Sequence, residues 1–211
     1  MPLLSEKKED KFSFAIWDVK ENLSFFQNHL TLAPHEKNEI KKYSQSRLLE
    51  WYASRFLLAL MHGQKNRENI YKDKYGKPFF ERTKTNLSIS HSENLVAAAL
   101  SPVNIGLDLQ VISEKVKIIK HKFLSARELH YCKDDLLCLN KMWTIKEAVY
   151  KAYGKKGLIF KENIKVSYFF KDKNGYIADA EIYTNIKKIK YRIFSYDFEK
   201  AILSIAIEKE K

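Results

Sequence analysis

The chain has 211 residues, of which 45% are hydrophobic, and it carries a formal net charge of +12. This hydrophobic content excludes wholesale disorder, and no apolar run approaches the ~18 residues that a membrane-spanning helix needs. The N-terminal apolar stretch is too short for a secretory signal peptide. We therefore expect a cytoplasmic protein with no membrane partner, built as one large domain or two smaller lobes.

The two cysteines, Cys132 and Cys138, are too few for a disulfide framework or a metal knuckle. We expect both thiols to pack as small apolar groups in a reducing compartment.

The positive charge has more than one interpretation. Only six of the 38 basic residues are arginine, and a lysine-rich chain can reflect codon bias alone. Alternatively, the charge attracts an acidic partner or a polyphosphate substrate over long range. A nucleic acid is a third candidate, but arginine is scarce and no nucleic-acid-binding motif accompanies the charge. We therefore expect no nucleic-acid partner.

The sequence of the N-terminal half predicts strands around one long helix. Residues 1–11 are charged and expected to be loose, and the helix is expected to run from Pro34 to about His62, before Gly63. A Y-G-K-P sequence over residues 75–78 predicts a turn. Alternating apolar residues predict strands over residues 12–19, 86–90 and 95–100.

The C-terminal half offers a similar plan after a break at Pro102. Ser125 and Glu128 fit a capping box, and a D-K-N-G sequence predicts a hairpin. Strands are expected over residues 104–112, 164–170, 176–183, 191–196 and 201–208, and helices over residues 113–121, 125–139 and 142–153, before a short charged tail. We predict an α+β fold of two lobes, residues 1–103 and 104–211.

The helix expected to start at Met142 has two different faces. At about 100° per residue, the apolar stripe consists of Met142, Ile145, Val149 and Ala152. The opposite side carries Trp143, Glu147, Tyr150 and Lys151. A carboxylate and a lysine thus stand one turn apart, either as an ordinary surface pair or as a functional pair. Gly154 is expected to end the helix.

The strand over residues 104–112 carries a second carboxylate. Because alternate residues share a face, Gly106, Asp108 and Gln110 lie on one side, with the glycine leaving room beside the polar groups. Such oxygen ligands suit Mg²⁺, which binds one or two carboxylates and substrate phosphates. Taken alone, Asp108 is more often a hydrogen-bonded edge residue. Glu147 could supply the second carboxylate.

Two further stretches are ambiguous in isolation. The S-I-S-H-S sequence, residues 88–92, is expected to form a polar turn that either binds phosphate or satisfies its own hydroxyl groups. Lys77, between Gly76 and Pro78, has the same two interpretations.

The order of these motifs is more specific than any one of them. The chain contains Y-G-K-P, S-I-S-H-S, G-L-D-L-Q, F-L-S-A-R-E and W-T-I-K-E-A-V-Y-K in this order. The set resembles the 4′-phosphopantetheinyl transferases of the surfactin-synthetase-activating (Sfp) type. Their hallmarks are a G-[IV]-D-[IVL]-E strand and a W-[ST]-x-K-E-A-x-x-K helix, and the helix motif matches from Trp143 to Lys151. The resemblance covers roughly residues 40–160.

The resemblance implies an Mg²⁺-dependent enzyme. It would transfer the phosphopantetheine arm of coenzyme A to a serine of an acyl or peptidyl carrier protein and release 3′,5′-ADP. It also implies two α+β lobes related by a pseudo-twofold axis, with coenzyme A in the cleft between them. Because the cleft is completed within one chain, we expect a monomer.

The resemblance also assigns roles to residues. Asp108 and Glu147 would bind Mg²⁺, and Lys151 would contact the diphosphate. The residues expected to hold the phosphates of coenzyme A are Lys77, Ser90 and His91, with Arg55 as a further contact. Glu128 falls where the family often has another acidic residue near the metal.

Gln110 departs from the family pattern, in which many relatives carry an acidic residue at this position. Glutamine offers a neutral carbonyl oxygen to a metal but adds no charge, so we expect a raised Mg²⁺ requirement rather than inactivity. Glu147 is the best candidate to accept the serine proton, although a carboxylate bound to Mg²⁺ is a poor base. The alternative function is a catalytically weakened protein of the same fold that binds coenzyme A or a carrier protein.

Overall fold

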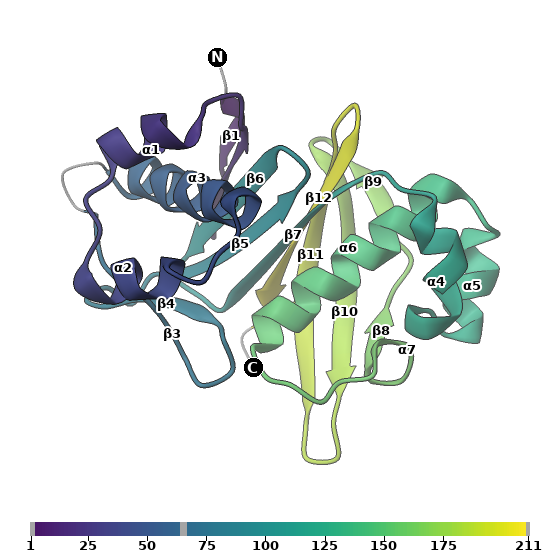
Figure 1. The fold of residues 1–211 in the computed structure, drawn as a ribbon. Coiled ribbons are helices and arrows are strands. Elements are labelled where there is room, and N and C mark those ends of the chain that lie inside the picture. The colour runs from purple at the N-terminus through teal and green to yellow at the C-terminus, as the bar shows by residue number, and fades with distance from the viewer. Residues whose placement is uncertain (1–2, 64–66, 210–211) are drawn as a thin grey trace.

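The computed structural model of the chain describes residues 3–63 and 67–209 and has an α+β fold (Figure 1). Two antiparallel sheets form its centre, one from each half of the chain. The expected fold class is therefore confirmed. Residues 1–2 and 210–211, at the two charged ends, lie outside the described residues.

The first sheet has the strand order β1–β2–β6–β5. Its strands are β1 (Leu3–Lys8), β2 (Ser13–Asp18), β5 (Asn86–Ser92) and β6 (Leu95–Ser101). The expectation that residues 1–11 are loose is wrong for residues 3–8, because β1 pairs antiparallel with β2. Half of the β1 side chains are charged, and all are exposed or partly exposed, so hydrophobic periodicity does not reveal a pairing made by the backbone.

The helices of this half are α1 (Leu23–His29), α2 (Pro34–Ile40) and α3 (Gln45–His62). The single long helix expected from Pro34 is wrong, because Ser44 adopts extended backbone and caps a new helix by accepting a hydrogen bond from the Arg47 N–H. A separate hairpin joins β3 (Ile70–Lys72) to β4 (Pro78–Phe80). Within the described ranges, no helix is long and apolar enough to cross a membrane.

The second sheet has the order β7–β12–β11–β10–β8, and β9 pairs with β10. Its strands are β7 (Ile105–Val111), β8 (Ile164–Val166), β9 (Phe170–Asp172), β10 (Gly175–Tyr183), β11 (Lys188–Asp197) and β12 (Ala201–Glu208). The strand expected over residues 164–170 is thus two short strands, β8 and β9. The expected hairpin at the D-K-N-G sequence is present, since Asp172 pairs with Gly175.

The helices of this half are α4 (Lys115–Phe123), α5 (Ala126–Cys132), α6 (Leu136–Tyr153) and α7 (Phe160–Asn163). The helix expected over residues 125–139 is wrong, because Lys133 and Asp134 both adopt positive φ. Asp135 then caps α6 through its hydrogen bond from the Cys138 N–H. The expected capping box of Ser125 and Glu128 is confirmed.

The cysteines correct the sequence-based expectation of two free thiols. Cys132 ends α5, Cys138 lies in the first turn of α6, and the two form a disulfide. The tight turn between the two helices brings the two sulfur atoms together. The number of cysteines and their spacing of six residues do not predict this turn.

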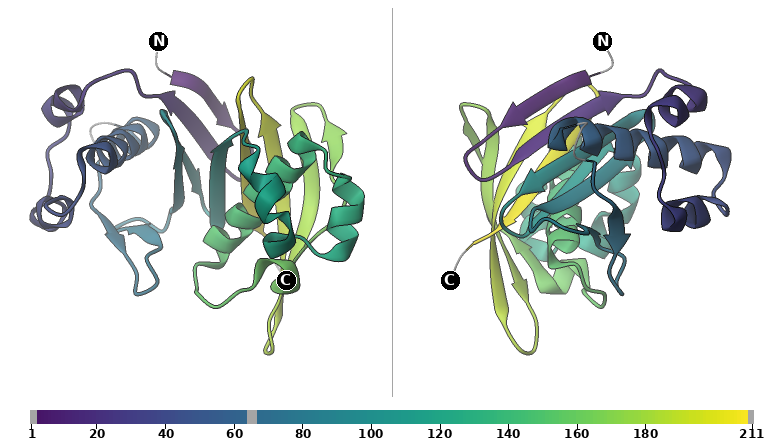
Figure 2. Two further views of the ribbon diagram at one scale, coloured as in Figure 1. Left: turned by 45° about the vertical axis from the view of Figure 1, so that its right-hand side comes forward. Right: turned by 90° about the vertical axis from the view of Figure 1, so that its left-hand side faces the viewer.

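Three buried clusters show that the layers stack as helix, sheet, sheet, helix (Figure 2). α3 covers one face of the first sheet, and the two sheets share a core between them. α6 covers the far face of the second sheet. Leu107 and Leu109 of β7 point into the shared core, so the alternate residues Gly106 and Asp108 face α6, as the strand pattern predicted.

The edges of the two sheets meet where β5 runs beside β7 (Figure 1). Serine hydroxyl groups bridge this junction. The Leu107 N–H donates to Ser88 Oγ at 2.8 Å, and the Val111 N–H donates to Ser92 Oγ at 3.0 Å. The S-I-S-H-S sequence is therefore part of a strand that joins the two halves, and not the polar turn expected from the sequence.

Candidate active site

The faces of α6 are as the sequence predicted. Met142, Ile145, Val149 and Ala152 are buried in the core of the second half. Glu147 and Lys151 are partly exposed on the opposite side. The helix ends at Gly154, which adopts the left-handed conformation with φ of +66° and donates its N–H to Tyr150 O.

Gly106 sets how closely β7 approaches α6. A Cβ atom at this position would lie 2.0 Å from Ala148 O and 2.3 Å from Ala152 N. The space that the sequence suggested for ligands beside Asp108 is therefore occupied by the helix backbone. The close approach places Asp108 against the helix turn that carries Glu147 and Lys151.

Three elements meet at Asp108. Lys151 Nζ of α6 lies 2.8 Å from Asp108 Oδ1, and Ser90 Oγ of β5 donates to the same oxygen at 2.8 Å. Lys151 also donates to Ser90 Oγ at 2.9 Å. Both bonds to Asp108 end on Oδ1 and neither uses Oδ2. The structure thus brings together three residues that the sequence predicted for one site.

Glu147 lies beside this cluster, where its surroundings disfavour the ionised form of its carboxyl group. Burial, and next the Asp108 carboxylate, raise the pKa of Glu147 to about 7, against an opposing effect of Lys151. A cation placed near both carboxylates would relieve the repulsion and stabilise the ionised form. This charge distribution fits a divalent metal.

The donor set for that metal is small. Gln110 lies on the same face of β7 as Asp108, and its Nε2 donates to Val111 O at 3.1 Å, so its side-chain oxygen is the atom it could offer. Among the residues that the structure describes, no group of three or more His, Cys, Asp or Glu side chains is arranged to hold a metal ion. Two carboxylates match a hard ion that keeps waters and takes its remaining ligands from phosphates.

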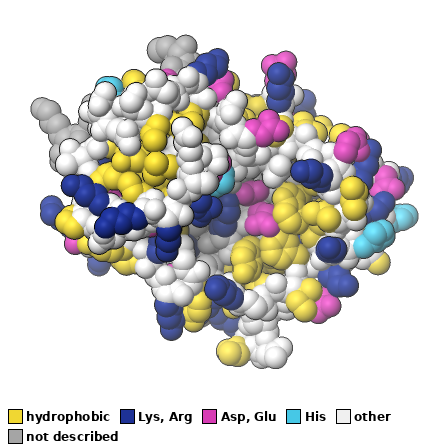
Figure 3. All heavy atoms as spheres, in the orientation of Figure 1, with side chains coloured by type: hydrophobic (Ala, Val, Ile, Leu, Met, Phe, Trp, Pro, Cys, Tyr) yellow, Lys and Arg dark blue, Asp and Glu magenta, His cyan; other side chains and the backbone are white. Residues whose placement is uncertain are grey.

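A cavity of about 370 Å³ opens beside this cluster. The β3–β4 hairpin forms one wall, β5 another, and the C-terminal turn of α6 a third. Its lining residues include Tyr75, Lys77, Ser88, Tyr150, Lys151, Lys155 and Lys156. Figure 3 shows acidic side chains in a hollow at the centre of this face, with basic side chains nearby and a hydrophobic area on one side. The volume is in the range of small-molecule sites, and several lysines suit a polyanionic ligand.

His91 follows Ser90 but contacts a different element. Its Nδ1 lies 3.3 Å from Glu50 Oε2 on α3, and its side chain is about half-exposed. The structure therefore pairs His91 with α3, and its contact with coenzyme A remains a prediction.

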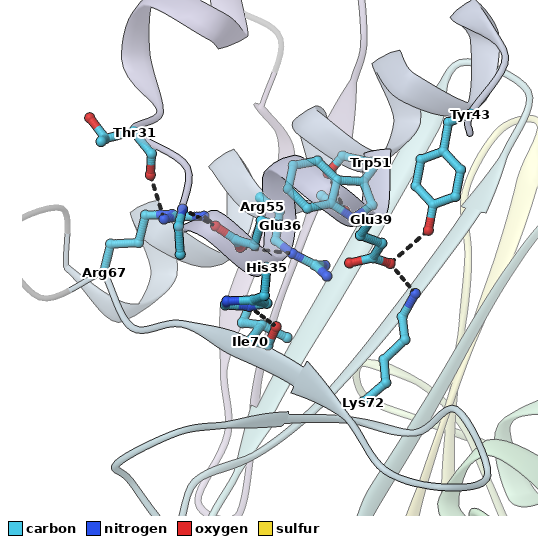
Figure 4. A network of polar contacts seen from close by, with 12 residues as sticks. Thr31, His35, Glu36, Glu39, Tyr43, Trp51, Arg55, Arg67, Ile70 and Lys72 are labelled. Atoms are coloured by element: carbon cyan, nitrogen blue, oxygen red, sulfur yellow. Dashed lines mark hydrogen bonds and ion pairs between the residues drawn. The ribbon is translucent and has the colours of Figure 1, made fainter. Parts of the chain in front are cut away.

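Arg55 lies elsewhere, inside the N-terminal half (Figure 4). Its guanidinium stacks over Trp51 at 4.7 Å, and its Nε is 3.8 Å from Glu36 Oε1. Arg67 holds Glu36 from the other side, with both Glu36 oxygens at 2.8 Å. Arg55 lines a separate small cavity, so the structure does not bring it to the Asp108 cluster.

Glu128 also has a separate place. It is buried, and its Oε2 accepts a hydrogen bond from Lys146 Nζ at 2.8 Å, while Oε1 accepts one from the Val166 N–H at 3.1 Å. Lys146 donates as well to the carbonyl groups of Phe123 and Ile164. The pair thus ties α5 and β8 to α6, which is a structural arrangement, and the structure does not place Glu128 beside Asp108.

Sequence reasoning missed Asn104, which lies just before β7. Asn104 Nδ2 donates to Ala152 O at 2.9 Å and to Glu208 Oε2 at 2.7 Å. No local pattern marks this asparagine, and only the fold shows that it reaches the end of α6.

Comparison with known proteins shows a family match in the C-terminal half of the chain. Residues 104–206 match the model of the 4′-phosphopantetheinyl transferase superfamily. This segment contains β7 and α6, and therefore Asp108, Glu147 and Lys151.

A curated relative extends the similarity beyond that segment. The chain is 29% identical over 160 residues to the 4′-phosphopantetheinyl transferase gsp of Aneurinibacillus migulanus. The match covers 74% of this chain and 64% of the relative, so the chain spans less than two thirds of that protein's length. The resemblance to Sfp-type 4′-phosphopantetheinyl transferases is confirmed.

Proposed function

We propose that this protein transfers the 4′-phosphopantetheine arm of coenzyme A to a serine of an acyl or peptidyl carrier protein. The observation that carries the proposal is the convergence of Asp108, Glu147 and Lys151 beside a lysine-rich cavity between the two halves. The superfamily match to residues 104–206 and the name of the curated relative support the same reaction.

The cavity would hold coenzyme A. Lys151 lies at its edge, where its ammonium group can neutralise a diphosphate as a point charge. Ser90 would orient Lys151 and Asp108, since it hydrogen-bonds both. His91 would complete the contacts to the outer phosphates.

Asp108 and Glu147 are the residues that would hold Mg²⁺, with the oxygen of Gln110 as a neutral third donor. When bound, Mg²⁺ would neutralise charge on the diphosphate as the bond to the leaving group weakens. Lys151, which already pairs with Asp108, would add a second positive charge from the protein itself.

The reaction balances with the groups named. A bond forms between the carrier serine oxygen and the β-phosphorus of coenzyme A, and the bond from that phosphorus to the bridging oxygen breaks. The leaving group is 3′,5′-ADP. Glu147 is the group we propose to take up the serine proton, because its carboxyl group is partly exposed at the site. Mg²⁺ bound there would hold its pKa below the metal-free value of about 7 and make it a weaker base.

The charge and the two-sheet fold bear on the partner and on the division of the chain. The net charge of +12 favours an acidic carrier protein. We propose a monomer that acts in the cytoplasm without a nucleic-acid or membrane partner. We also propose that the two lobes divide between residues 103 and 104, which agrees with the separation of the two sheets.

One observation favours the alternative of a weakened enzyme. Gln110 adds no charge to the carboxylate pair, and its amide group is engaged with Val111 O. A protein with this site could bind coenzyme A or a carrier protein and turn over slowly.

Intact-mass spectrometry tests the proposal. An apo carrier protein is incubated with the full chain, coenzyme A and Mg²⁺, and Glu147→Ala is the matched control. A mass gain of one phosphopantetheine that disappears in the control supports the transferase. No gain with several carriers at high Mg²⁺, together with measurable binding of coenzyme A, supports the weakened protein and excludes the transferase.

A further inference from the structure

The side chain of Lys77 does not point freely into the cavity that it lines. Its Nζ donates to Ala152 O at 2.9 Å and also to Asn104 Oδ1. Ala152 lies in the last turn of α6, one residue after Lys151. A lysine of the first half of the chain thus bonds two residues of the second half, at the helix end that carries the candidate site.

The backbone of Lys77 is held firmly before its side chain crosses. Asp73 Oδ1 accepts hydrogen bonds from the N–H groups of Tyr75 and Lys77, each at 2.9 Å. The Asp73 N–H donates to Lys77 O at 2.9 Å and closes the hairpin. The β3–β4 hairpin is therefore a defined support, and the position of the Lys77 stem follows from it.

The end of α6 is a favourable place for the Lys77 ammonium group. The last carbonyl groups of a helix lack partners within the helix and carry partial negative charge, so a lysine at this place is favourable. Ala152 O accepts from Asn104 Nδ2 at 2.9 Å in addition to Lys77 Nζ. Gly154 leaves room for the stem, since a Cβ atom there would lie 2.7 Å from Lys77 Cδ.

These contacts connect two walls of one cavity. The hairpin contributes Tyr75, Gly76 and Pro78 to the lining, and the end of α6 contributes Lys151 and Gly154. The Lys77 side chain bonds one wall to the other. Burial lowers its pKa, opposed by the charges of Asp73 and Glu208.

We infer that Lys77 is a positioning residue that fastens the β3–β4 hairpin to the C-terminal turn of α6. By doing so it sets the width of the cavity and the place of Lys151. The inference rests on the proposed function, and it gives Lys77 a role different from direct contact with a phosphate group. Asn104 is its partner in this role.

The first experiment measures binding of coenzyme A to the full chain by calorimetry, with Mg²⁺ present. Lys77→Met keeps the stem and removes the ammonium group, and Asn104→Ala removes the partner. Lys74→Met is the matched control, because it removes the same charge from the same hairpin at a side chain that contacts the ring of its neighbour Tyr75. We expect Lys77→Met and Asn104→Ala each to weaken binding about tenfold, and Lys74→Met to change it less than about twofold.

Two comparisons separate positioning from direct contact. If Lys77 and Asn104 act through one shared arrangement, the double variant should bind coenzyme A about as weakly as the weaker-binding single variant. It also predicts an equal loss for coenzyme A and for dephospho-coenzyme A, which lacks the 3′-phosphate. In steady-state kinetics, KM for coenzyme A should rise about tenfold while kcat stays within about twofold. An unchanged affinity in Asn104→Ala, additive losses, or a loss confined to the ligand with the 3′-phosphate would overturn the inference.

A second measurement does not depend on coenzyme A. In ligand-free protein, hydrogen exchange of residues 73–78 and 150–154 should accelerate in Lys77→Met and Asn104→Ala, and not in Lys74→Met. Accelerated exchange in the two variants, together with a wild-type protein that binds no coenzyme A, would support the positioning role of Lys77 and refute the proposed function. Unchanged exchange, with wild-type binding of coenzyme A, would refute the fastening and leave the function intact.

Discussion

At the scale of single residues, the candidate site depends on two carboxyl groups in unlike surroundings. Asp108 is stabilised as a carboxylate by Lys151 and Ser90, whose donors lie 2.8 Å from its Oδ1. Glu147 is held near Asp108 with its pKa raised to about 7, chiefly by burial. Asp108 thus has two donors on one oxygen, whereas Glu147 is balanced between its two forms at neutral pH.

The pKa of Glu147 leads to the first prediction. The folded protein holds this proton up to about pH 7, whereas the ordinary value is 4.5, so the group reduces the free energy of unfolding as pH rises from 4.5 to 7. In metal-free protein, NMR of carboxyl-labelled glutamate should show a midpoint near 7 that is missing in Glu147→Gln. Mg²⁺ should lower that midpoint, and a metal-free midpoint near 4.5 would contradict the prediction.

Gln110 leads to the second prediction. Glu at this position would add a negative charge on the same face of β7 as Asp108, so Gln110→Glu should bind Mg²⁺ more tightly, by about tenfold. The Mg²⁺ concentration that gives half-maximal transfer should fall by a similar factor. Gln110→Ala is the control for loss of the neutral oxygen. The idea is wrong if Gln110→Glu leaves the Mg²⁺ dependence unchanged.

At the scale of elements, the site depends on how closely β7 approaches α6. Strand β7 offers Asp108 on its α6 side and leucines on the other, and α6 offers Glu147 and Lys151. Neither element makes a site alone. Their contact at Gly106 brings the three charged groups together, because a side chain there would collide with the helix backbone.

Gly106→Ala tests this approach directly. The added methyl group must displace Ala148 O and Ala152 N, so the free energy of unfolding should fall by about 1–3 kcal/mol, and coenzyme A binding should weaken. Urea denaturation of the full chain measures the loss. In Gly157→Ala the added methyl group meets nothing within 4 Å, and only the positive φ is strained, so a loss of about 1 kcal/mol is expected. Equal stability of Gly106→Ala and the wild type would show that the helix yields easily.

At the scale of the whole molecule, the two halves meet along β5 and β7 and again at Lys77. The cavity lies between these junctions, so its shape depends on both halves at once. The excess of positive charge is also a property of the whole chain, and it acts on a partner before any contact forms.

The charge leads to the last prediction. Raising NaCl from about 20 to about 300 mM shortens the screening length from roughly 20 Å to roughly 6 Å. The association rate with an acidic carrier protein should then fall at least about tenfold, while the dissociation rate changes less. Stopped-flow fluorescence measures both rates. An association rate that does not change with salt would show that the net charge does not drive binding of the partner.

The sequence by itself determined the features that depend on neighbours along the chain. The two faces of α6, its end at Gly154, the face of β7 that carries Asp108, and the α+β class follow from local periodicity and capping. The ordered motifs also indicated the similarity to the transferases. Boundaries were less predictable, since the breaks before α3 and α6 depend on single capping residues inside longer helical patterns.

Only the tertiary structure decided which partners the charged groups find. Arg55 pairs with Glu36, Glu128 pairs with Lys146, and Lys77 reaches Ala152 O, although the sequence pointed all three towards the ligand site. The raised pKa of Glu147 likewise needs burial and a neighbour from another element. These properties arise from contacts between residues far apart in the chain, whose distances and solvent exposure no local pattern encodes.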